Sequence, residues 1–112
     1  IAALLPFHGN QFKIFHRDGG GYREVFAYPV ENDFYHAVIS GRIRGERMFA
    51  GGARKLAADL FLVRWDGERG GYFTQQLEAG SGPSNLAILN AAGGDYLLSA
   101  NRMIFEAAAY RF

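Results

Sequence analysis

The sequence contains no cysteine, and proline is scarce, with three residues among 112. Disulfide bonds and thiolate metal sites are therefore excluded, while the compartment stays open because many exported bacterial proteins also lack cysteine. The apolar stretch over residues 1–6 is too short to span a membrane, and no basic segment with a cleavage site accompanies it. We therefore expect neither a membrane span nor a targeting signal.

An excess of one charge sign is also missing. The chain has twelve Lys and Arg residues and eleven Asp and Glu residues, which gives a formal net charge of +1. So small and evenly mixed a charge does not create the positive field that attracts nucleic acid or an anionic membrane. Neither nucleic acid nor a membrane is expected as a partner.

Glycine and apolar residues are plentiful instead. Fifteen glycines and a hydrophobic content of 49% indicate a globular chain in which short apolar runs alternate with tight turns. The pattern predicts ten β-strands, at residues 3–7, 12–17, 22–28, 36–40, 47–51, 60–65, 72–77, 85–90, 96–100 and 106–112. Residues 53–62 have apolar residues at helical spacing, but the run LFLVRW at 60–65 suits a pleated surface, so a strand is preferred there.

The chain also repeats itself. Residues 12–19 (FKIFHRDG) correspond to residues 60–67 (LFLVRWDG), and residues 34–39 (FYHAVI) correspond to residues 83–88 (PSNLAI), at a period of about 48 residues. A repeat of this length with four strands matches the blade of a β-propeller. The expected fold is therefore all-β, with propeller-like blades of four-stranded antiparallel sheets.

Taking one repeat as one blade, which we call the blade frame, divides the chain into about two and a third blades. Residues 1–34 are the end of a first blade, residues 35–82 a second blade and residues 83–112 the start of a third. Both ends of the sequence lie in apolar runs, which favours a fragment of a larger propeller. The expected partners are the remaining blades of a longer chain or further copies in a homo-oligomer, because open sheet edges pair readily.

Three stretches resemble the blades of bacterial propellers built from FG-GAP or VCBS-type repeats. They are the repeated pattern Phe-x-Ile-Phe-x-x-Asp-Gly, residues 80–85 (GSGPSN) and residues 99–102 (SANR). The resemblance implies a propeller fold used for adhesion, surface binding or sugar-lyase chemistry. The Asp-x-Asp-x-Asp-Gly calcium loop of that family is missing, and Asp18-Gly19 and Asp66-Gly67 retain only its end, so we expect no metal or other cofactor.

Four polar side chains are candidates for a binding site at one end of the central channel. In the blade frame His36 opens an inner strand and His8 lies at the exit of a second strand, with Asn85 and Asn101 as their repeat partners. Loops held by a rigid scaffold are where binding sites usually form. The alternative is that these side chains only hold turns together through bonds to neighbouring backbone groups.

Two arginines at equivalent places extend this candidate site. Arg54 and Arg102 suit a bidentate contact with an anion such as a uronate carboxylate, although surface arginines often only pair with nearby charges. Asp18 and Asp66 precede glycines and are expected to serve their turns. The recurring aromatic residues are expected to pack between sheets, and sugar stacking on Tyr35 or Trp65 is the alternative.

The chemistry therefore points to a non-catalytic binding or scaffold segment of a propeller that recognises carbohydrate or another polar ligand at the channel mouth. No complete catalytic constellation, dinucleotide fingerprint or phosphate-binding loop occurs. The alternative is a sugar lyase or hydrolase in which His36 or His8 acts as acid or base and Arg54 or Arg102 stabilises developing charge.

Overall fold

The fold is described from a computed structural model of the chain, which covers residues 2–4, 10–31 and 34–112. In these residues all regular structure is β except for one short 3-10 helix, η1 (Arg102–Ile104). The predicted all-β class with antiparallel sheets is confirmed. No helix of the described residues is long and apolar enough to cross a membrane.

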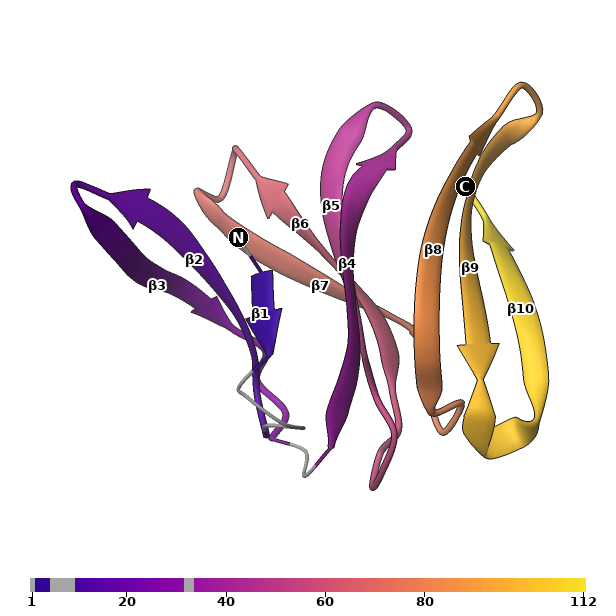
Figure 1. The fold of residues 1–112 in the computed structure, drawn as a ribbon. Coiled ribbons are helices and arrows are strands. Elements are labelled where there is room, and N and C mark those ends of the chain that lie inside the picture. The colour runs from indigo at the N-terminus through magenta and orange to yellow at the C-terminus, as the bar shows by residue number, and fades with distance from the viewer. Residues whose placement is uncertain (1, 5–9, 32–33) are drawn as a thin grey trace.

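The strands form three sheets that follow one another along the chain (Figure 1). The first sheet has the order β1-β2-β3, the second β4-β5-β6-β7 and the third β8-β9-β10. Within each sheet, every strand therefore pairs only with strands adjacent to it in the chain, and all these pairs are antiparallel. The strands are β1 (Ala2–Leu4), β2 (Phe12–Asp18), β3 (Gly21–Ala27), β4 (Tyr35–Ile43), β5 (Glu46–Ala53), β6 (Leu60–Asp66), β7 (Gly71–Glu78), β8 (Pro83–Ala91), β9 (Gly94–Asn101) and β10 (Glu106–Arg111).

All ten predicted strands are present where the structure describes them, and residues 5–7 of the first prediction lie outside the described residues. The helix alternative at residues 53–62 does not form. A turn in which Leu56 and Ala58 adopt positive φ leads into β6 instead. The short connections suit their turns: Arg44 and Gly45 between β4 and β5 have φ of 53° and 79°, as the two central residues of a type I′ hairpin require.

The second sheet is buried on both faces, so β6 is apolar along most of its length. Phe61 and Val63 pack with the first sheet, whereas Leu60 and Leu62 pack with the third. This is why residues 60–63 read as a continuous apolar run rather than as an alternation. The core is two inter-sheet layers, one around Phe12, Ile14, Tyr28, Tyr35, Ala53, Phe61 and Val63, and one around Ile43, Met48, Ala50, Leu60, Leu62 and Leu97.

The second and third sheets approach closely because glycines face the third sheet. A Cβ on Gly52 would overlap the ring of Pro83, and a Cβ on Gly41 would lie 2.6 Å from Cδ1 of Ile88. A larger residue at Gly52 would force the sheets to shift, because the Pro83 ring is rigid. One at Gly41 would first displace the end of the Ile88 side chain.

Hydrogen bonds join the hairpin tips of the second and third sheets. The backbone N–H of Arg44 donates to Oδ2 of Asp95 at 2.5 Å, and the Asn90 amide donates to the Arg42 carbonyl at 2.8 Å. The Asn90 amide also donates to Asp95, and these bonds hold the pKa of the Asp95 carboxyl below its usual value. The second and third sheets are thus joined by apolar contacts at their centre and by hydrogen bonds at one end.

Candidate functional site

The structure brings two of the predicted site residues together. His36 lies near the start of β4, and Arg54 follows the end of β5, which is the antiparallel neighbour of β4. Nη1 of Arg54 donates to Nε2 of His36 at 3.4 Å, and both side chains are half-buried. Because a guanidinium only donates, the accepting Nε2 carries no proton in this arrangement.

An aromatic ring forms the base of this pair. The Phe34 ring stacks on the His36 imidazole with centroids 5.9 Å apart and an interplanar angle of 9°. Cζ of Arg54 lies 5.4 Å from the Phe34 centroid, and Nζ of Lys55 lies 5.0 Å from it. The backbone N–H of Arg54 also donates to the Phe34 carbonyl at 2.8 Å. Two cations and an imidazole therefore surround one ring, within the range of cation–π attraction. We call these four residues the Phe34 cluster.

The Phe34 cluster is rich in positive charge. The ion pairs between described residues are Lys13–Glu24, Arg23–Asp18 and Arg69–Asp66, and none of them involves Arg54 or Lys55. A guanidinium beside an ammonium and an imidazole can donate several hydrogen bonds to one carboxylate. The arrangement is therefore suited to binding an anionic group.

Asn101 lies in a different environment, a buried polar network between the second and third sheets. Its side chain is almost fully buried and donates to the Glu106 carboxylate and to the Tyr110 hydroxyl, each at 3.3 Å. The Tyr110 hydroxyl in turn donates to Glu78 of β7, and burial together with this bond raises the pKa of Tyr110 to about 12. The amide of Asn101 is thus occupied by structural partners.

Asn85 and Arg102 are exposed and lie apart from this network. Asn85 pairs with Ala100, so its side chain shares a face of the third sheet with Ala100, whereas Asn101, the next residue along β9, faces the other way. Arg102 opens η1, and its backbone N–H donates to the Gly82 carbonyl. His8 lies outside the described residues. Of the five candidates that the structure describes, His36 and Arg54 belong to the Phe34 cluster and the other three do not.

Sequence reasoning missed several members of this region. Phe34 and Lys55 carry no motif, and the pairing of β4 with β5 brings them together with His36 and Arg54.

Asp59 is a buried carboxylate that accepts a hydrogen bond from the Gln76 amide at 3.2 Å. Burial raises the pKa of Asp59, and the hydrogen bond from Gln76 only partly offsets that effect. In the sequence Asp59 is a lone aspartate between apolar residues, and nothing there indicates that its carboxyl is buried or that its pKa is raised.

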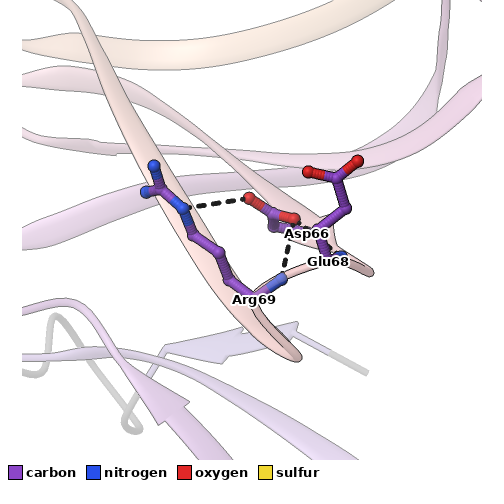
Figure 2. Close-up of polar contacts among 3 residues, drawn as sticks. All are labelled: Asp66, Glu68 and Arg69. Atoms are coloured by element: carbon purple, nitrogen blue, oxygen red, sulfur yellow. Dashed lines mark hydrogen bonds and ion pairs between the residues drawn. The ribbon is translucent and has the colours of Figure 1, made fainter.

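The predicted turn role of Asp66 is confirmed. Its Oδ1 accepts the backbone N–H groups of Glu68 and Arg69 at 3.0 and 3.1 Å, and its Oδ2 lies 3.6 Å from Nε of Arg69 (Figure 2). The carboxylate is therefore committed to its own turn. Among the described residues no group of three or more histidine, aspartate or glutamate side chains is placed to hold a metal ion.

No protein-family model, curated protein or solved structure matches the chain.

Proposed function

We propose that this chain is a scaffold and binding segment of a β-propeller and that the Phe34 cluster recognises a carboxylate-bearing ligand such as a uronate-containing carbohydrate. The observation that carries the scaffold proposal is the strand order. The second sheet is a four-stranded antiparallel meander, and the sheets before and after it pack on its two faces. A propeller blade has this strand order and packs in this way.

The strand registers further support a repeating unit. In the second sheet Ile39, Ala50 and Leu62 form one row across three strands, on the face that packs against the third sheet. In the third sheet Ala87, Leu98 and Ala109 form the corresponding row, about 48 residues further along the chain. Equivalent rows are what successive blades of one array possess, with residues 35–82 as one blade and residues 83–112 as the start of the next.

The ligand class follows from the charge and shape of the Phe34 cluster. Arg54 and Lys55 supply positive charge, and the Phe34 ring supplies an apolar surface beside it. A sugar acid has both matching features, because its carboxylate suits the guanidinium and its C–H groups suit the ring.

A lyase or hydrolase is the second candidate, because His36 and Arg54 are adjacent as an acid–base group and a charge stabiliser would be. Nε2 of His36, however, already accepts from Arg54, so proton abstraction would require that contact to open. Binding needs no such change, and the geometry favours it.

Calorimetric titration with trigalacturonate tests the ligand proposal. We expect saturable binding that weakens with salt, because a charged contact is screened. Arg54→Gln should lower the affinity about tenfold, the effect of losing one charge-assisted contact. Arg23→Gln is the matched control, because Arg23 is paired with Asp18 in the exposed β2–β3 hairpin.

Absence of binding, or equal affinity of the two arginine variants, would refute the ligand proposal. Ultraviolet absorbance of the same mixtures reports an unsaturated uronate product. Its accumulation, together with its loss in His36→Gln, would establish the lyase in place of a binding segment.

A further inference from the structure

The two hairpins of the second sheet separate at their tips. Pairing of β5 with β6 ends at Met48 and Arg64, whereas β5 continues to pair with β4 as far as Glu46 and β6 with β7 as far as Asp66. The fork between the hairpins holds an open hollow of about 620 Å³. A hollow of this size can take one or two rings of a small ligand. It lies at the opposite end of the second sheet from the Phe34 cluster.

Trp65 forms one wall of this hollow and is only half covered. Its indole meets the Tyr72 ring edge-on with centroids 5.2 Å apart, and the His16 ring lies 6.3 Å away. His16 and Tyr72 are themselves hydrogen-bonded between Nε2 and the hydroxyl at 2.6 Å. Neighbours in two sheets therefore hold the indole in place, yet 51% of Trp65 stays exposed.

This exposure separates Trp65 from the other aromatic residue weighed for sugar stacking. Tyr35 is 1% exposed, and its hydroxyl donates to the Val30 carbonyl, so packing accounts for it fully. For Trp65 packing covers only about half of the residue. Its exposed part is an apolar surface held in place before any ligand arrives, which lowers the entropic cost of binding.

Charged side chains of both signs line the same hollow. Glu46 and Arg47 come from the start of β5, and Glu68 comes from the β6–β7 turn. In the part of the chain that the structure describes, no ion pair involves any of these three residues. Figure 2 shows the Glu68 carboxylate pointing away from the Arg69 guanidinium, which pairs with Asp66 instead.

We propose that this fork is a binding site for a neutral sugar, whose ring stacks on the exposed part of Trp65. The C–H groups of a pyranose cover the indole, while its hydroxyls donate to the carboxylates of Glu46 and Glu68 and accept from Arg47. The site is independent of the Phe34 cluster and of the ligand proposed there.

The mixed charge of the hollow selects a neutral ligand. An anion would meet the carboxylates of Glu46 and Glu68, and a bulky cation would meet the guanidinium groups of Arg47 and Arg64. A polyhydroxylated ligand can both donate and accept, so it can use both kinds of group without carrying charge.

Trp65 is the single tryptophan of the chain, so intrinsic fluorescence reports this site directly. The probes are neutral hexasaccharides of β-1,4-glucose, β-1,4-mannose and β-1,4-xylose and of α-1,4-glucose, each titrated at fixed protein concentration. We expect at least one to give a saturable blue shift of the emission, because a stacked ring removes water from the indole.

Saturation-transfer NMR with the same hexasaccharides extends the test to variants without tryptophan. Trp65→Ala should weaken binding about tenfold or more, the loss expected when an aromatic platform is removed. Glu68→Gln, on an exposed turn, should weaken it by a smaller factor. The matched control Tyr22→Ala removes a more exposed aromatic residue outside the hollow, at 61%, and should bind as the unaltered chain does.

Three results would overturn the neutral-sugar site. They are the absence of a saturable shift with all four hexasaccharides, unchanged binding in Trp65→Ala, and tighter binding of trigalacturonate than of the hexasaccharides in the fluorescence titration. Arg54→Gln separates this site from the Phe34 cluster, because it should leave hexasaccharide binding unchanged even where it abolishes trigalacturonate binding.

Discussion

A half-buried phenol and a buried carboxyl show how individual residues hold the stacked sheets together. The Tyr110 hydroxyl of β10 donates to Glu78 of β7, and its raised pKa of about 12 means that the neutral form is the one the fold requires. Burial raises the pKa of the Tyr28 and Tyr35 hydroxyls, and the carboxylate of Asp59, in the turn before β6, adds to this effect. In both Asp59 and Tyr110 the fold favours the protonated form, so each contributes stability that is lost as pH rises, Asp59 in the acid range and Tyr110 above about pH 10.

We predict that Asp59→Asn stabilises the protein at neutral pH. A carboxyl whose folded pKa is raised contributes stability that is complete below its unfolded pKa, about 3.8, and is lost as pH rises through the folded pKa. At pH 7 the unaltered chain therefore bears the cost of a buried charge. Asparagine removes the charge and keeps an oxygen for Gln76, so the gain should be roughly 1 kcal/mol at pH 7 and should vanish below about pH 4.

Urea unfolding at a series of pH values measures this difference. Asp18→Asn is the control, because the Asp18 carboxylate is 63% exposed and pairs with Arg23 at the surface. An Asp59→Asn chain that is less stable than the parent at every pH would show that the charge of Asp59 stabilises the fold.

At the scale of elements, the contact between the second and third sheets depends on β5 presenting glycine. We predict that Gly52→Ala destabilises the protein by about 1–3 kcal/mol, because the added methyl group meets the rigid ring of Pro83 and the two sheets must shift. The control is Gly20→Ala in the β2–β3 turn, where an added Cβ would meet no atom within 4 Å. Urea midpoints compare the two variants, and equal midpoints would mean that the sheets are loosely packed at this point.

The elements were largely predictable from the sequence, and the site was not. Strand positions followed from short apolar runs between glycines, and β6 could be distinguished from a helix by its β-branched and aromatic residues. The contact of His36 with Arg54 depends on the register of β4 against β5, which a bulge shifts between Tyr35 and Ala37. Periodicity carries no information on such a shift, nor on which face Asn85 and Asn101 occupy.

At the scale of the whole molecule, no described residue packs over the outer face of the third sheet (Figure 1). The outer face of the third sheet carries Ala87, Leu89 and Ala109, all exposed, while the corresponding row of the second sheet is packed against a neighbour. We predict that the isolated chain self-associates through this face, since exposed apolar patches of this kind bury themselves when they can.

Light scattering behind a sizing column should therefore give a mass above that of one chain, rising with concentration. Leu89→Lys should lower that mass, because a charge on the face opposes its burial. Leu56→Lys is a matched control, because it adds the same charge to a leucine that is 72% exposed in the turn before β6. A single-chain mass at all concentrations would show that this face is stable in water.

The chain order of the sheets also has a kinetic consequence. Because each strand pairs with the strand next to it in the sequence, every ladder forms by zipping a local hairpin, and no distant segment must be found first. Such a chain should fold faster than a sandwich of the same length with Greek-key connections. During synthesis on a ribosome, each sheet can close as soon as its last strand emerges and can then serve as the surface on which the next sheet assembles.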